Sequence, residues 1–258
     1  MGYTHTAIGS ATALTVSMLM GEQSSEMFLV ASVAGAVGGV LEDIDCKDNK
    51  RVTDAGRTRL SVLILLCIGV ICHFVLIYNR TLNMTVKDFI GSINGEDAFN
   101  TGQRISSLLF GTVCLMILLL LASHSRHRTF SHSLTFILLG TLCVDFMVPK
   151  ATPYYFIGGP SHLLIDFLNY PFEGHGIWLF YPMKTGCGIA FKVCRAGSLG
   201  NKIIYFTGII AYTAVSIFYI YKLIINVGAT SIVVPVIILA YMLIATNLVR
   251  IKSEKELS

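Results

Sequence analysis

The feature that most constrains this chain is its series of long apolar blocks, which make lipid the solvent for most of it. Apolar runs separated by polar breaks give eight candidate spans: 7–20, 27–41, 60–78, 105–122, 133–148, 153–170, 203–225 and 230–249. A run of roughly 17 to 25 apolar residues crosses a bilayer as a helix. With 13% charged residues and a mean hydropathy of +0.70, too few charges remain to cover a soluble surface. The sequence therefore predicts an all-α, polytopic transmembrane helix bundle with about eight spans.

The chain is predicted to form a single integral membrane domain over residues 1–258, since the longest polar stretches are only 79–104 and 171–202. The polar motifs described below occupy about residues 1–185, and two apolar spans form a C-terminal helical hairpin over about 203–249. The seven cysteines are odd in number, include no C-x-x-C pair and mostly lie in apolar runs. This usage argues against a disulfide framework.

The distribution of positive charge indicates how the spans are oriented. Threading eight spans places 1–6, 42–59, 123–132, 171–202 and the C-terminal tail on one side, together with 14 of the 19 lysines and arginines. The positive-inside rule makes that side cytoplasmic and predicts that both termini are in the cytoplasm. No run of basic residues is long enough to suggest a nucleic-acid arm, so we expect no nucleic-acid partner.

Candidate metal ligands fall on the same cytoplasmic side. His162 and Asp166 are four residues apart near the end of the sixth span, so a helix would place them on one face about 6 Å apart. Asp43 and Asp45 alternate at the end of the second span, where an extended turn could direct both carboxylates toward cations. Because polar groups at membrane depth are costly and usually face a functional cavity, we expect these segments to form one site.

A polar turn before the fifth span supplies His127 and His132, with Arg128 as a clamp for an anionic group. The predicted metal ligands are His5, Asp43, Asp45, His127, His132, His162 and Asp166. The predicted catalytic residues are Arg128, Asp45 and His132. Imidazole with carboxylate suits zinc, manganese or iron better than calcium. We therefore expect one to three divalent ions, with zinc as the first choice and manganese or iron as alternatives.

Plainer interpretations exist for several of these residues. Asp43 and Asp45 alone would be typical of a solvated helix end, and His162 with Asp166 could form an interhelical hydrogen bond. His73, in an apolar span without an acidic neighbour, is interpreted as a packing histidine. The sequence assigns no role to His124 or His175.

Five motifs occur in an order that resembles a known family. They are Thr4-His5 with Ile8-Gly9, Leu41-x-Asp43-Ile44-Asp45, His127-Arg128-x-x-Ser131-His132-Ser133, Ser161-His162-Leu163-Leu164-x-Asp166 and Leu179-x-Tyr181-Pro182. In this order they resemble the YdjM-like family of predicted membrane-bound metal-dependent hydrolases, over roughly residues 1 to 185. Glu42 departs from the family pattern, which usually has proline there, and Cys46 stands where histidine is frequent.

The resemblance implies a multi-pass protein of the bacterial inner (plasma) membrane, linked to the SOS response through LexA-controlled expression, with phospholipase-like activity. With the residues above, it favours a metal-dependent hydrolase at the cytoplasmic lipid interface, acting on a phosphoester such as a phospholipid. The expected partner is a membrane lipid or an amphiphilic small molecule. The sequence fixes neither this substrate nor the oligomeric state.

Two other functions are compatible with the same residues. The alternative is a divalent-metal-binding transporter or a metal-responsive membrane protein, and a catalytically inactive scaffold is a third option. Transport favours ligands near the midplane of the membrane. The candidates here gather at one interface, which favours hydrolysis.

Overall fold

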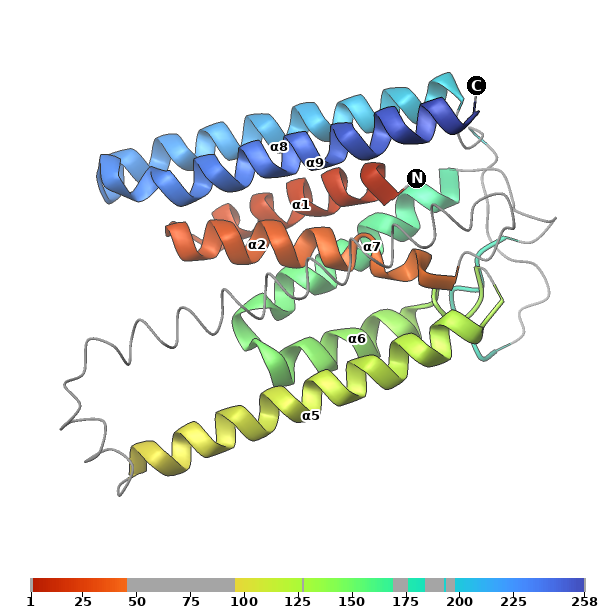
Figure 1. Cartoon of the computed structure of the whole chain (residues 1–258), viewed down its shortest axis with the longest axis horizontal. Helices are drawn as coiled ribbons and strands as arrows, with labels where there is room; N and C mark the ends of the chain where they lie inside the picture. The colour runs from red at the N-terminus through yellow and green to blue at the C-terminus, as the bar shows by residue number, and fades with distance from the viewer. Residues whose placement is uncertain are drawn as a thin grey trace.

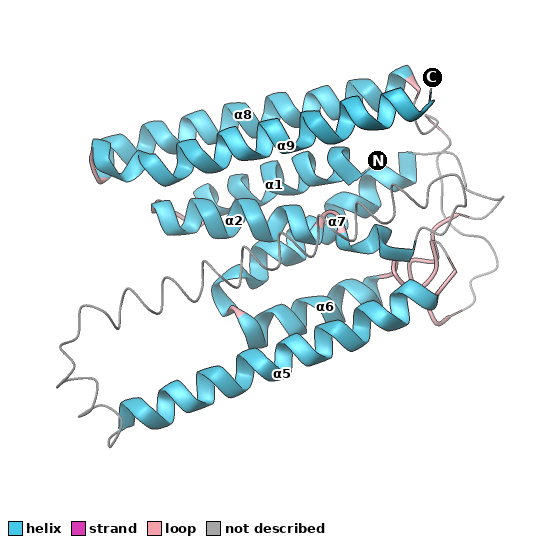
Figure 2. Ribbon diagram, in the orientation of Figure 1, coloured by secondary structure: helices cyan, strands magenta, loops and turns pink. Residues whose placement is uncertain are grey.

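The computed structural model describes residues 2–45, 96–126, 128–168, 176–183, 193 and 198–257. Helices dominate these residues, and no β-strand occurs among them (Figure 2). The prediction of an all-α protein is therefore confirmed for the described part of the chain. The predicted span 60–78 lies outside the described residues.

Each of the other predicted spans coincides with a helix. The elements are α1 (Gly2–Leu19), α2 (Ser25–Gly38), η1 (Leu41–Asp45), α5 (Glu96–His124), α6 (Leu134–Met147), η2 (Pro149–Ala151), α7 (Thr152–Leu168), α8 (Leu199–Asn226), η3 (Ala229–Ile232) and α9 (Val233–Leu257). Segments Ser106–His124 and Leu199–Asn226 are long and apolar enough to cross a membrane, and Ser25–Gly38, Leu134–Met147 and Val233–Ala245 are shorter apolar helices. The total of eight spans stays a prediction.

Serine caps define where several helices begin. The side chain of Ser24 accepts a hydrogen bond from the backbone N–H of Met27 at the start of α2. Ser133 does the same for the N–H of Phe136 at the start of α6. An N-terminal serine satisfies a backbone donor that has no partner within the helix. These caps fix the ends of short helices: α2 and α6 have 14 residues each, roughly 21 Å at 1.5 Å per residue.

Small residues bring the central helices into close contact. α1 packs against α2, α7 and α8, while α2 also packs against α7 (Figure 1). A Cβ atom on Gly158 of α7 would lie only 2.6 Å from the carbonyl oxygen of Gly35 in α2. A Cβ atom on Gly39 would lie 2.6 Å from the carbonyl oxygen of His5. Backbone packing of this kind is typical of membrane helices.

The outer helices cover this core and expose apolar side chains. α5 packs against α6, and α8 and α9 form a pair beside α1 (Figure 1). Tyr205, Tyr212 and Tyr219, seven residues apart along α8, are all buried. By contrast, Leu109 and Leu121 of α5 are well exposed, as lipid-facing residues should be.

Candidate metal centre

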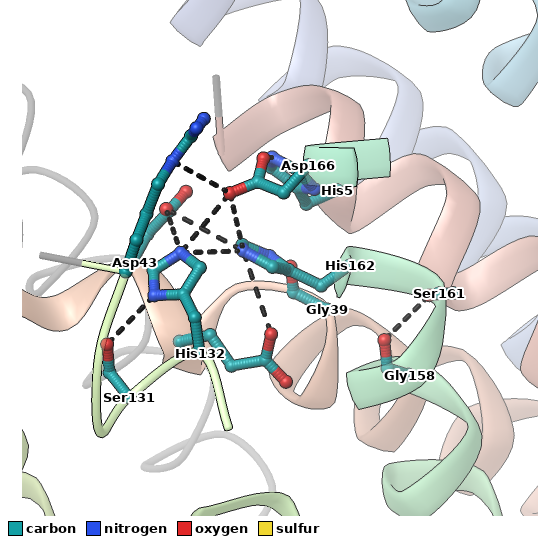
Figure 3. A network of polar contacts seen from close by, with 11 residues as sticks. His5, Gly39, Asp43, Ser131, His132, Gly158, Ser161, His162 and Asp166 are labelled. Carbon is teal, nitrogen blue, oxygen red and sulfur yellow. Dashed lines mark hydrogen bonds and ion pairs between the residues drawn. The ribbon is translucent and has the colours of Figure 1, made fainter. Parts of the chain in front are cut away.

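Four segments that are distant in sequence bring polar side chains together in one network (Figure 3). His5 lies in the first turn of α1, and Asp43 lies in η1 just beyond α2. His132 lies directly before the serine cap of α6, and Asp166 lies in the last turn of α7. Because each residue is at or beyond a helix end, the site occupies the end of the bundle rather than its middle.

The centre of this cluster is a set of four potential metal ligands, Asp43, His132, His162 and Asp166. One donor atom from each residue lies within 4.8 Å of the others. His132 Nε2 lies 3.3 Å from Asp166 Oδ2 and 3.7 Å from Asp43 Oδ1. His162 Nε2 lies 3.7 Å from Asp166 Oδ2 and 3.8 Å from Asp43 Oδ1. Two imidazoles and two carboxylates thus surround a common point.

The orientation of His162 is fixed by the backbone of α2. Its Nδ1 donates a hydrogen bond to the carbonyl oxygen of Gly39 at 2.8 Å, which leaves Nε2 as the lone-pair atom facing the cluster. His132 Nδ1 lies 2.8 Å from Ser131 Oγ, and its Nε2 lies 3.3 Å from His162 Nε2. A backbone or hydroxyl partner on the far nitrogen is the usual support of a metal-binding histidine.

His5 supports the cluster from the side of α1. Its ring stacks on that of His162 with the centroids 3.9 Å apart, and its Nε2 lies 3.5 Å from Asp166 Oδ1. Asp166 therefore meets His5 through one oxygen and His132 and His162 through the other. His5 was predicted as a ligand, but it lies outside the four-residue donor set and contacts two of its members.

Arg128 supplies positive charge at the edge of the cluster. Its side chain is buried, and its Nε lies 3.9 Å from Asp166 Oδ2. The backbone of Arg128 is left-handed, with φ 64°, and its carbonyl oxygen accepts a 3.0 Å hydrogen bond from the N–H of Trp178. This contact ties the polar turn to the segment 176–183.

Glu42 is a member of the cluster that is absent from the predicted ligands. Its side chain is 1% exposed, and its Oε2 lies 3.7 Å from His162 Nε2. Burial raises the pKa of Glu42 to about 8, against the opposing charges of His162 and His132. For neighbouring Asp43, burial also acts to raise the pKa, but the charge of His162 and the contact with His132 outweigh it and lower the pKa. In the sequence, the one indication that Glu42 has a special role is the departure from the proline that is usual at position 42 in the family.

Two predicted ligands are not placed by the structure. His127 and the side chain of Asp45 lie outside the described residues, so their ligand roles stay predictions. The extended turn expected for Asp43 and Asp45 is wrong, because the chain forms a 3-10 helix from Leu41 to Asp45. A 3-10 helix repeats every three residues, whereas a common face for alternate residues requires extended backbone.

The chemistry of this cluster fits a divalent cation. Neither carboxylate oxygen of Glu42, nor Nδ1 of His5, has a hydrogen-bond partner among the described residues, although all three atoms are buried. Buried polar atoms are normally satisfied, so such a concentration beside facing donor atoms points to a missing positive ligand. Imidazole nitrogen and carboxylate oxygen are donors that suit zinc, manganese and iron.

Comparison with known proteins gives one finding that concerns the whole chain. The family model described as YdjM inner membrane protein matches residues 1–251. The match extends beyond the motif-bearing residues 1–185 and includes α8 and most of α9. No curated protein and no solved structure matches the chain.

Proposed function

The chain belongs to the YdjM inner membrane protein family, and from this membership and the buried cluster we propose that it is a membrane-bound metal-dependent hydrolase. The proposed reaction is hydrolysis of a phosphoester, with a phospholipid or similar amphiphile as substrate. The observation that carries the proposal is the convergence of Asp43, His132, His162 and Asp166 from η1, the turn before α6, and α7.

These four residues would hold the metal, with zinc as the first choice and manganese or iron as alternatives. When bound, a divalent ion polarises a phosphoryl oxygen and lowers the pKa of water toward neutrality. The protein must keep the donor atoms in place before the ion arrives. Gly39 and Ser131 do so for the two imidazoles, and His5 does so for Asp166.

Arg128 is suited to bind the anionic part of the substrate. A guanidinium group offers several donors in a planar arrangement that matches phosphate oxygens. Because the side chain is largely removed from water, its contact with an anion would be stronger than at an open surface. Arg128 therefore orients the phosphoester toward the four donor residues.

A lipid substrate is favoured by the segment 176–183, which lies next to the cluster. Besides the bond from Trp178 to Arg128, the N–H of Leu134 donates to the carbonyl oxygen of Leu179 at 2.9 Å. Phe180 and Met183 in the same segment are 52% and 72% exposed. Aromatic and apolar residues at the end of a membrane bundle suit the level of lipid headgroups. A headgroup could reach the donor residues while its chains stay in the bilayer.

Metal binding and hydrolysis in one preparation test this proposal. The purified protein in detergent micelles, first stripped with a chelator, is given zinc or manganese and a short-chain phosphatidylglycerol. We expect His162→Ala and Asp166→Asn to lose both metal and turnover, because each removes a central donor. His124→Ala is the matched control, since His124 is exposed and bonds only within its own helix end.

Three results would contradict the hydrolase. If the wild-type protein bound no divalent ion, the proposed metal centre would be wrong. Metal retained in both ligand variants would show that the donors are wrongly assigned. Stoichiometric metal binding without hydrolysis, accompanied by movement of the ion across liposome membranes, would identify a transporter, and binding with neither activity would identify an inactive scaffold.

A further inference from the structure

Among the described residues, Glu42 is a fully buried carboxyl group that the four-residue centre does not use. It stands one residue before Asp43 in η1, and its side chain is almost completely buried. Its Oε1 fills the space over Gly159 of α7, where a Cβ atom would lie 3.0 Å from that oxygen. The absence of a side chain at Gly159 thus makes room for a carboxylate next to the metal centre.

No neighbour among the described residues explains why Glu42 is buried. Neither of its oxygens accepts a hydrogen bond there. The nearest charged partner is His162, whose Nε2 lies 3.7 Å from Oε2. That nitrogen is the same atom that faces Asp43 and Asp166. Glu42 therefore approaches the centre from the side of His162, at the nitrogen that also faces Asp43 and Asp166.

The charges of the cluster favour the same conclusion. Glu42, Asp43 and Asp166 contribute three carboxylates, and Arg128 contributes one guanidinium group. In a metal-bound state the histidines are neutral and all three carboxyl groups are ionised, so the described residues of the cluster carry a formal charge of −2. Buried charge without compensation is strongly unfavourable. One divalent cation would neutralise the cluster, but only if Glu42 is counted with the other two carboxylates.

From this geometry we infer that Glu42 is a fifth protein ligand of the metal centre, which makes the site suited to a six-coordinate ion such as Mn²⁺ or Fe²⁺ rather than to tetrahedral Zn²⁺. The inference rests on the proposed metal centre and deepens it by choosing the alternatives to zinc that were named there. Four protein ligands alone would complete a tetrahedral zinc site and leave no position for a reacting group. Three carboxylates and two imidazoles instead suit an octahedral ion, with one position left open.

Metal binding distinguishes this inference from the proposed function. Chelator-treated wild-type protein in detergent is titrated with Mn²⁺, followed by electron paramagnetic resonance of the free ion, and separately with Zn²⁺ and Co²⁺. We expect wild type to bind Mn²⁺ with the weak visible Co²⁺ bands of a five- or six-coordinate site. Glu42→Gln should raise the Mn²⁺ dissociation constant about tenfold or more. It should also shift the preference toward Zn²⁺ and strengthen the Co²⁺ bands toward those of a tetrahedral site.

Two further variants keep the test interpretable. Glu42→Asp retains the charge but shortens the side chain, so it should also weaken Mn²⁺ binding if reach to the ion matters. Glu26→Gln is the control, because Glu26 is exposed at the other end of α2 and pairs with Lys150 at 3.0 Å. If wild type binds a divalent ion and both Glu42 variants keep its affinity, its preference and the Co²⁺ spectrum, the fifth ligand is overturned while the metal centre stands. If wild type binds no divalent ion, both fall.

Discussion

Arg128 combines a left-handed backbone with a buried positive charge, and both features bear on the site. A long side chain at φ 64° is uncommon and persists only where its surroundings hold it. Here the hydrogen bond from Trp178 fixes the carbonyl oxygen, and the guanidinium group meets Asp166 at 3.9 Å. Backbone strain of this kind is often found where a side chain must be aimed at a ligand.

Replacing Arg128 should separate its effect on the metal from its effect on the substrate. We predict that Arg128→Asn binds the divalent ion more tightly than wild type, because a positive charge next to the ion has been removed. The same variant should turn over an anionic phosphoester far more slowly and with a higher KM. Asparagine tolerates left-handed backbone, so this variant should melt at a higher temperature than one with a β-branched residue at the same position.

The comparison for this prediction is Arg128→Val. A β-branched residue at φ 64° should cost about 1–3 kcal/mol in the free energy of unfolding. Titration calorimetry, turnover and thermal unfolding of the two variants measure these effects. If Arg128→Asn turned over substrate like wild type, Arg128 would have no part in substrate binding.

The sequence predicted much of the residue set but not its full composition. His132, His162 and Asp166 could be recognised because imidazoles and a carboxylate next to apolar spans are costly without a function. Glu42 could not, because a glutamate at a helix end is usually solvated. Its burial depends on the approach of Gly159 in α7, which is a tertiary contact between segments over 100 residues apart. No local pattern reports such a contact.

At the scale of the helices, glycine contacts connect stability with the site. The Cβ of an alanine at position 158 would lie 2.6 Å from the carbonyl oxygen of Gly35 and 2.9 Å from the backbone nitrogen of Gly39. Backbone atoms cannot rotate away as a side chain can. The same Gly39 accepts the hydrogen bond that orients His162. A change in the spacing of α2 and α7 should therefore reach the donor atoms.

We predict that Gly158→Ala lowers both the stability of the bundle and its metal affinity. The expected loss is about 1–3 kcal/mol, the usual cost of overpacking a close contact. Gly208→Ala is the matched control, because its Cβ would meet Ile8 Cγ1 at 2.7 Å, and this flexible side chain can move. Thermal unfolding and metal titration of both variants check the prediction. Equal loss in the two variants would show that backbone contact between α2 and α7 is not the determining feature.

The apolar blocks predicted the positions of the helices well, but they did not predict the residues at which the helices begin and end. The first predicted span began at residue 7, but α1 begins at Gly2 and so includes His5 in its first turn. At the other end of the chain, α9 continues to Leu257, well beyond the predicted limit at residue 249. An apolar block marks the part of a helix that suits lipid, while backbone hydrogen bonding continues through polar residues. Ends are therefore set by caps and tertiary contacts.

In the molecule as a whole, the candidate metal centre and both ends of the described chain lie at the same end of the bundle. The start of α1 and the end of α9 are close to that end in Figure 1, and α7 finishes there with Asp166. The turns between α1 and α2 and between α8 and α9 lie at the opposite end. α2 and α6 are shorter than α5 and α8. The donor residues next to the ends of these short helices therefore lie at the level where apolar helix gives way to polar turns.

This arrangement leads to a prediction about sidedness that links charge to mechanism. With eight spans threaded as predicted, the side that holds the proposed metal centre also receives 14 of the 19 lysines and arginines, so it should face the cytoplasm. A fluorescent protein fused after Ser258 should then fluoresce, because it folds in the cytoplasm. Alkaline phosphatase inserted in the turn Gly228–Ser231 should be active, because that enzyme requires the opposite, oxidising side. As a control, insertion in the turn 20–23 should also be active, since both turns lie at one end of the bundle. If alkaline phosphatase were inactive at both turns, the orientation would be the reverse, and the proposed substrate would lie in the outer leaflet. If it were active at only one of the two turns, an odd number of crossings would separate them, and this result would contradict the bundle.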